Sequence, residues 1–188
     1  MKHLFIINPA AGSSDRTAEY SAEIRTVCEA RRLRYEIRVS MGPGDCANIA
    51  REAAQTGQEL RIYACGGDGT LNRFVNDTRG IEFSNEILYY AAGSGNDFLR
   101  TYGTRAEFTD LDAQLAGGEV TIDLLETSLG LSATICAAGL DAQVAYGIPK
   151  FRRIPLCGGE MAYALSIVEQ LCGQIGRKIE YDIDGEKL

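Results

Sequence analysis

The chain has little of several features that would assign it to a common class of protein. It carries 19 Lys+Arg against 26 Asp+Glu, a formal net charge of −7, so it lacks the basic surface expected for binding duplex nucleic acid. No run reaches the roughly 18 consecutive apolar residues of a membrane span, and the first apolar run is interrupted too early for a signal peptide. We therefore expect a cytoplasmic protein with no nucleic-acid partner.

Cysteine and histidine are placed in a way that argues against metal-thiolate and triad chemistry. There is no C-x-x-C pair, and His3 is the only histidine, so a Ser-His-Asp triad is not expected. Any proton transfer must then come from Asp or Glu. All six cysteines lie in apolar patterns, and we interpret them as small reduced core residues: Cys28, Cys46, Cys65, Cys136, Cys157 and Cys172.

What is present is a repeating strand and helix pattern. Strand signals occur at 3–7, 35–39, 60–64 and 87–91. Three of them are short apolar runs typical of buried strands, whereas apolar and charged residues alternate at 35–39. Stretches with helical spacing of apolar residues follow the first three strand signals. This alternation predicts an α/β fold built on a doubly wound, mostly parallel sheet.

The pattern changes after Gly118. Two β-like segments, 120–125 and 131–138, follow with no helix between them, which indicates antiparallel pairing. We place a domain boundary here, between an α/β domain over 1–118 and a second, β-rich domain over 119–188. This second part contains one long helix around 161–172 and a last strand that runs into a turn at 184–186.

Two segments of this second part have alternative interpretations. The basic-aromatic stretch 150–154 is interpreted as a solvated loop, although it could also touch lipid head groups. The apolar stripe over 161–172 is interpreted as core. If it is uncovered instead, it favours self-association into a homodimer.

Small-residue loops follow three of the predicted strands, at 8–12, 66–70 and 93–97. In a doubly wound sheet these loops lie at one edge, where glycine and free backbone N–H groups favour polyphosphate. Asp68 and Asp97 would repel bare phosphate, but they suit a bridging divalent cation, so we expect a nucleoside triphosphate with Mg²⁺. The alternative is that the glycines only form tight turns and the aspartates only cap helices.

Known phosphate-binding motifs are absent. The sequence contains neither the G-x-x-x-x-G-K-[ST] loop nor a protein-kinase catalytic set, and its first strand is not followed by G-x-G-x-x-G. The phosphate cradle must therefore be of another kind.

The three loops together carry a resemblance. Gly-Gly-Asp-Gly-Thr-Leu-Asn at 66–72, Asn-Pro-Ala-Ala-Gly at 8–12 and Gly-Ser-Gly-Asn-Asp-Phe at 93–98 resemble the diacylglycerol kinase catalytic domain family, which includes bacterial lipid kinases and sphingosine and ceramide kinases. The first motif alone is shared with nicotinamide dinucleotide kinases. Further segments at 122–124, 138–142 and 159–163 resemble the family's entry into its second domain and the helix that follows.

This resemblance implies ATP- and Mg²⁺-dependent phosphorylation of a lipid alcohol, such as diacylglycerol or a sphingoid base, with transient contact with the inner membrane face. The domain over 1–118 would bind the nucleotide, and the part over 119–188 would be an incomplete lipid or substrate domain. Asp68 and Asp97 would be catalytic and, with Asp123, would organise Mg²⁺. The residues implied in nucleotide binding are Asn8, Pro9, Ala10, Ala11, Gly12, Ser40, Gly66, Gly67, Asp68, Gly69, Thr70, Leu71, Asn72, Ser94 and Asn96.

Departures from the family pattern leave other functions open. Arg73 stands where the family commonly has Glu, and it could pair with phosphate or with Asp77. The family's catalytic base lies in a late Asp-Gly-Glu-like motif that we expect beyond residue 188, and Glu186 is not interpreted as that base. The alternatives are a catalytically inactive nucleotide- or lipid-binding regulator and an enzyme similar to NAD kinases.

Overall fold

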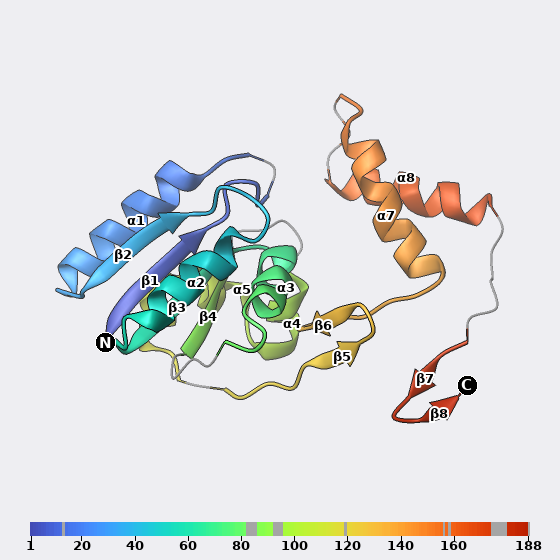
Figure 1. Ribbon diagram of the computed structural model, residues 1–188. Helices are drawn as coiled ribbons and strands as arrows, with labels where there is room; N and C mark the ends of the chain where they lie inside the picture. The colour runs from blue at the N-terminus through green and yellow to red at the C-terminus, as the bar shows by residue number, and fades with distance from the viewer. Residues whose placement is uncertain are drawn as a thin grey trace. The chain divides into compact units, whose positions relative to one another are not determined.

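The computed structural model of the protein describes residues 1–12, 14–81, 86–91, 96–118, 120–155, 157, 159–173 and 180–187. The chain divides into two compact units, residues 1–135 and 136–188 (Figure 1). We refer to them as the first and second units and describe each by itself.

The first unit contains a four-stranded parallel sheet with the strand order β2-β1-β3-β4. The strands are β1 (Lys2–Ile7), β2 (Tyr35–Val39), β3 (Leu60–Gly66) and β4 (Glu86–Ala91). All four predicted strands are confirmed, and β1 and β3 are the inner ones. Their near-continuous apolar sequence follows from burial on both faces of the sheet.

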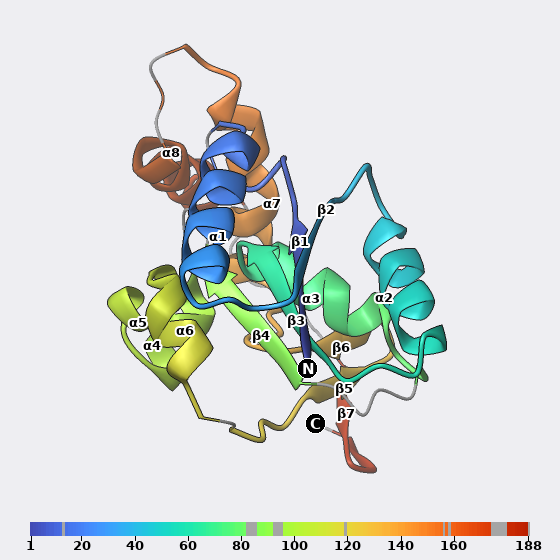
Figure 2. The same ribbon diagram turned by 90° about the vertical axis from the view of Figure 1, so that its left-hand side faces the viewer.

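Alternate residues of the inner strands point to opposite faces, and each face has its own core. Phe5, Ile7, Tyr63 and Cys65 pack against α1 (Thr17–Ala30) and against Leu111 of α6 (Leu111–Ala116). Leu4, Ile6, Ile62 and Ala64 pack on the other face against α2 (Asp45–Gln55) and against Phe74 of α3 (Asp68–Asp77). Figure 2 shows α1 on one side of the sheet and α2 and α3 on the other. The predicted doubly wound fold is therefore confirmed.

Short elements complete the first unit. The helices α4 (Asp97–Tyr102) and α5 (Arg105–Thr109) precede α6, and Thr104 begins α5 with a capping box in which Glu107 takes part. A two-stranded antiparallel hairpin follows, formed by β5 (Leu125–Thr127) and β6 (Gly130–Ser132).

The predicted antiparallel pair is confirmed in this hairpin, but its strands are shorter than the predicted segments 120–125 and 131–138. The hairpin belongs to the first compact unit, which extends to Ile135. Compactness does not test where the second domain begins, so the boundary near Gly118 stays a prediction.

The second unit contains two helices and a minimal hairpin. The helices are α7 (Leu140–Arg152) and α8 (Gly159–Leu171), and the strands are β7 (Asp182–Ile183) and β8 (Glu186–Lys187). Helix α8 confirms the predicted long helix, and the antiparallel pairing of β7 with β8 confirms the turn at 184–186. No helix among the described residues has the length and apolar character needed to cross a membrane.

Two interpretations of the second unit are wrong. Residues 150–152, interpreted as part of a loop, form the last turn of α7. Gly147 and Pro149, which weaken the helical signal in the sequence, lie inside this helix. Cys28, Cys46 and Cys65 are buried as expected, but Cys136 and Cys172 are exposed and Cys157 is half-buried, because they lie outside the layered core of the first unit.

Candidate functional site

The strand order places a crevice at the carboxyl end of the sheet. The connection through α1 leads from β1 to β2 on one side, whereas the connection through α2 leads to β3 on the other side of β1. The order reverses between β1 and β3, and ligands of open α/β sheets bind outside the strand ends at such a point. Asn8 follows β1 here, and Gly67 and Asp68 follow β3.

A direct hydrogen bond joins the first two predicted loops. The Asn8 Nδ2 donates to Thr70 Oγ1 at 2.8 Å, and the Asn8 Oδ1 accepts from the backbone N–H of Ala10 at 3.0 Å. A side chain at Gly66 would collide with the Thr70 side chain, so glycine is required at the end of β3. The loops at 8–12 and 66–70 therefore form one structure.

Asp68 connects this structure to the start of α4. Its Oδ2 accepts from the backbone N–H of Asp97 at 2.9 Å, and its Oδ1 accepts from that of Phe98 at 2.9 Å. Both acceptors satisfy donors that are free at a helix N-terminus. The end of the third loop thus reaches the other two, while its residues 93–95, including the predicted site residue Ser94, lie outside the described residues.

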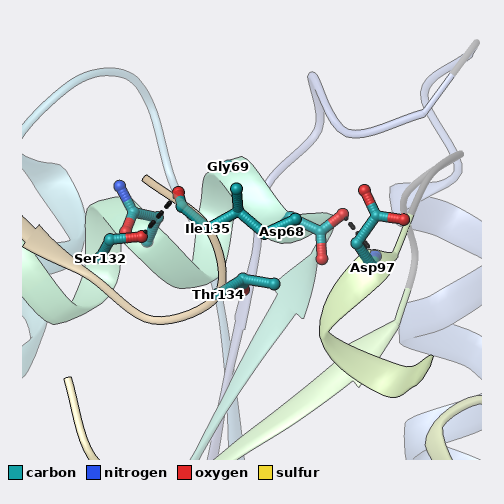
Figure 3. Close-up of a pocket in the computed structure, with 7 residues that line it drawn as sticks. Asp68, Gly69, Asp97, Ser132, Thr134 and Ile135 are labelled. Carbon is teal, nitrogen blue, oxygen red and sulfur yellow. Dashed lines mark hydrogen bonds between the residues drawn. The ribbon is translucent and has the colours of Figure 1, made fainter. Parts of the chain in front are cut away.

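A cavity of about 230 Å³ lies beside these two aspartates. Its lining residues are Asp68, Gly69, Asn72, Asp97, Ser132, Thr134 and Ile135. Figure 3 shows the Asp68 and Asp97 side chains together at one end of the group and Ser132 at the other. Helix starts therefore form one wall of the cavity, and the residues that end β6 and follow it form the second wall.

The residues that line the cavity fit a divalent cation in part. Asp68 and Asp97 supply hard carboxylate oxygens to one cavity, and Mg²⁺ in phosphoryl-transfer sites usually binds one or two carboxylates together with phosphate oxygens. Asp97 also forms an ion pair with Arg100 at 3.1 Å. Asp123 is exposed and does not line the cavity, and no cluster of three potential metal-ligating side chains occurs in the described part of the chain.

Several other predicted site residues shape the loops through burial. Leu71 packs in a small core with Phe98 and Ala133, and the buried Ser40 donates its backbone N–H to the carbonyl of Ile7 at 2.8 Å. Asn96 is fully buried and adopts a left-handed backbone with φ 55° directly before α4. Asparagine tolerates this conformation better than most residues.

The remaining loop residues offer more surface to a ligand. Ala10, Gly12 and Gly69 are exposed, whereas Pro9, Ala11 and Gly67 are half-buried. Contact between the nucleotide and any of the predicted residues stays a prediction.

Sequence reasoning missed the second wall of the cavity, formed by Ser132, Thr134 and Ile135. One signal was available, because Asn72 and Asn76 repeat at four-residue spacing after Asp68 and predict one polar face of α3. Arg73 is exposed, and no ion pair to Asp77 is found in the part of the chain that the structure describes.

The fold and the linked loops define an open, doubly wound α/β protein with a ligand crevice at the carboxyl ends of its strands. The family described as "Diacylglycerol kinase catalytic domain" matches residues 2–127. The chain belongs to this family.

Named relatives agree with this family. The chain is 29% identical over 145 residues to "Diacylglycerol kinase" of Bacillus subtilis (strain 168), covering 76% of this chain and 47% of the relative. It is 26% identical over 160 residues to "Probable lipid kinase YegS-like" of Pseudomonas fluorescens, covering 74% of this chain and 53% of the relative. The chain thus spans about half the length of these curated relatives.

A solved structure is also similar. The chain matches a crystal structure described as a diacylglycerol kinase from Bacillus anthracis str. Sterne with 26% identity and a TM-score of 0.47. The match covers 61% of this chain and 42% of the other.

Proposed function

We propose that this chain forms the nucleotide-binding part of an ATP-dependent lipid kinase that transfers the γ-phosphate to a lipid hydroxyl. Family membership supports the class of lipid kinases. The observation that carries the proposal is the position of Asp68, whose carboxylate is fixed by the start of α4 and lines a cavity together with Asp97.

The loops supply what a triphosphate needs. The start of α3 offers free backbone N–H groups directly after Gly67, where a helix N-terminus favours anions. The Asn8–Thr70 hydrogen bond fixes the loop at 8–12 beside this helix start, so both can contact one nucleotide. Phosphoryl transfer depends mainly on such positioning and on neutralisation of charge.

Asp68 and Asp97 would hold Mg²⁺, which neutralises phosphate charge when bound. Because Asp68 accepts two backbone hydrogen bonds, its carboxylate is oriented before any ligand binds. Each of its oxygens keeps a further lone pair for a cation.

The acceptor and the cellular setting follow from the same proposal. A lipid alcohol is the expected acceptor, reached by transient contact with the inner membrane face from the cytoplasm. Homodimer formation also stays a prediction, and α8 supports it with apolar side chains that are about half exposed, such as Met161 at 57% and Val168 at 57%.

The first test is thermal denaturation with ATP and Mg²⁺, added together and separately. At about 100 times the dissociation constant, a ligand stabilises the folded state by roughly 2.7 kcal/mol, which raises the melting temperature by several degrees. The same measurement with GTP and with a nicotinamide dinucleotide shows whether the stabilisation is specific to ATP. The absence of any shift with ATP would contradict the proposal.

The second test is transfer of radiolabelled phosphate from ATP to diacylglycerol, sphingosine and NAD. Labelling of a lipid supports the proposed kinase, and labelling of NAD alone would identify an enzyme similar to NAD kinases. Binding of ATP without any transfer would instead favour the inactive regulator. The exposed Arg73 beside the predicted nucleotide loop is the feature of this chain that favours that second candidate.

A further inference from the structure

The two walls of the cavity differ in how they are supported. Asp68 and Asn72 stand on α3, which packs against the sheet through Phe74, and Asp97 begins α4, which packs against Leu71 of α3. Ser132, Thr134 and Ile135 belong instead to a hairpin and the residues after it. The hairpin strands β5 and β6 have only three residues each. An isolated two-stranded hairpin is marginally stable in water, so this wall needs support from outside the hairpin.

Asn76 supplies this support through its carboxamide. The Asn76 Nδ2 donates to the carbonyl oxygen of Leu131 at 2.7 Å, and the Asn76 Oδ1 accepts from the backbone N–H of the same residue at 2.8 Å. The Nδ2 also donates to the carbonyl oxygen of Asn72 at 2.8 Å, one helical turn earlier. A helix side chain thus bonds the β6 backbone as a neighbouring strand would.

Other contacts hold the hairpin in the same position against α3. The Asn72 Oδ1 accepts from the backbone N–H of Ala133 at 3.3 Å, and Arg79 forms an ion pair with Glu126 of β5. Gly130 has φ +129°, and a side chain there would collide with the Asn76 carboxamide. Ala133 is buried against Leu71 and Phe98, which fixes the start of the second wall.

The pair of bonds to Leu131 requires asparagine. A carboxamide presents a donor and an acceptor on one carbon, whereas a carboxylate presents only acceptors. Aspartate would therefore place an oxygen against the Leu131 carbonyl and leave both without a donor. Glutamine keeps both groups but moves them outward by one methylene.

Asp68 and Gly69 of the loop at 66–70 line the cavity, whereas Asn8 and Thr70 do not. Thr70 points to Asn8 after β1, whereas Asp68 points to the start of α4. The attacking and leaving oxygens of a phosphoryl transfer lie roughly in line, so the acceptor approaches from the side opposite to the nucleotide. If the nucleotide lies against the loop at 8–12 and Thr70, the acceptor belongs on the side of the cavity.

We infer that Asn76 is a positioning residue, which sets the second wall of the cavity, at Thr134 and Ile135, against Asp68 and thereby shapes the site of the acceptor alcohol. The assignment of the cavity to the acceptor rests on the proposed kinase function, whereas the support that Asn76 gives to the second wall does not. Asn76 does not line the cavity, so its effect on the acceptor is transmitted through the backbone of residues 131–135.

The test compares Asn76→Asp and Asn76→Gln with the matched control Asn48→Asp. Asn48 is exposed on α2, and its side chain accepts a hydrogen bond from Arg51 at 3.3 Å. Three quantities are measured on the full chain: amide hydrogen exchange of residues 130–135, affinity for dioctanoylglycerol, and affinity for ATP with Mg²⁺. The first two report on the wall and the third on the nucleotide loops.

In Asn76→Asp we expect exchange at Leu131 and Ala133 to rise by at least about tenfold, because the partly buried bond to the Leu131 carbonyl is lost and two oxygens face each other in its place. Affinity for dioctanoylglycerol falls by about tenfold, while affinity for ATP stays within about twofold. Asn76→Gln has a smaller effect in the same direction and still folds if Asn76→Asp does not. Asn48→Asp changes none of the three.

Unchanged affinity for dioctanoylglycerol in the Asn76 variants would overturn the inference. An equal loss of affinity for ATP and for dioctanoylglycerol would also overturn it, because that result is expected if Asn76 only stabilises the fold. Failure of wild-type protein to bind dioctanoylglycerol would overturn it as well. If the wild-type protein binds dioctanoylglycerol but not ATP, the proposed function is overturned. The role of Asn76 is then decided by amide exchange and by affinity for dioctanoylglycerol.

Discussion

The two units of the chain contain similar apolar residues but bury them to different extents. In the first unit the sheet separates two cores, and the side chains of Phe5, Tyr63 and Phe74 have no exposed surface. In the second unit α7 and α8 contact each other closely, with Ser166 Oγ donating to the carbonyl oxygen of Val144 at 2.7 Å. Met161, Val168 and Leu171 of α8 nevertheless stay at least half exposed.

The difference shows that layering, rather than composition, decides burial. A sheet covered on both faces buries alternate residues in two directions, whereas a helix pair buries only the facing stripes. The close contact of α7 and α8 depends on small residues, because a side chain at Gly147 would collide with Ser166. Two experiments test how far this contrast between the units holds, and two more compare sites within the first unit.

The largest expected effect concerns thiol reactivity. Burial raises the pKa of the Cys28 thiol to about 11 and raises that of Cys65 as well, whereas Cys136 and Cys172 are exposed. We expect Cys28 and Cys65 to react with a maleimide at least about 10⁴-fold more slowly than Cys136 and Cys172, because they react only after the core opens. Mass spectrometry after timed quenching measures this.

Denaturant should abolish the difference, which provides the control. Similar rates for all four thiols in the absence of denaturant would mean that the first unit opens as readily as the second.

The next effect is on the free energy of unfolding. Phe74→Ala removes a fully buried ring from the core between α2, α3 and the sheet, and we expect a loss of about 3–5 kcal/mol. Val168→Ala on the exposed face of α8 should change stability by no more than about 0.5 kcal/mol. Urea denaturation measures the free energy of unfolding of both variants.

A large loss in Val168→Ala would show that its side chain is buried in solution, for instance between two copies of the chain. The concentration dependence of unfolding would then distinguish a homodimer from a monomer.

A third effect separates the carboxylates of the predicted metal site. Asp68→Asn should remove most of the stabilisation by ATP with Mg²⁺, roughly 2.7 kcal/mol at saturation, because Asp68 lines the cavity. Asp123→Asn should retain it, since Asp123 is exposed and does not line the cavity. Thermal shifts with ATP and Mg²⁺ measure both variants, and an equal loss in the two would restore the predicted network of three aspartates.

The smallest effect is a pH dependence in the first unit. Hydrogen bonds from Lys2 and then Arg38 lower the pKa of Glu36. A lowered folded-state pKa stabilises the fold above the unfolded value of about 4.3, and this stabilisation is lost as pH falls through the folded value. Glu36→Gln should therefore cost about 0.5 kcal/mol at pH 7 and less near pH 3.

Urea denaturation at the two pH values measures this difference. Equal losses at both would mean that packing of the side chain, and not its charge, is responsible.

The sequence predicted the parts of this protein that depend on local patterns. The inner strands β1 and β3 were predictable because burial on both faces leaves a continuous apolar run. The positions of Asp68 and Asp97 at one edge followed from strand ends and from the family motif. Helix α7 was missed because Gly147 and Pro149 interrupt its pattern.

The second wall of the cavity was not predictable in the same way. It depends on the bonds between Asn76 and Leu131, which are 55 residues apart in the chain. Backbone groups of β6 carry these bonds, and every sequence contains such groups. Only the fold shows which of them a particular asparagine reaches.

The central position of β1 also determines when the protein can complete its fold during synthesis. This strand leaves the ribosome before its two neighbours, which begin only at Tyr35 and Leu60. Its pairing is therefore non-local, and such contacts form slowly because long loops must close first. Until β3 has been made, the apolar β1 must avoid other partners, so the growing chain is most prone to aggregation before its third strand appears.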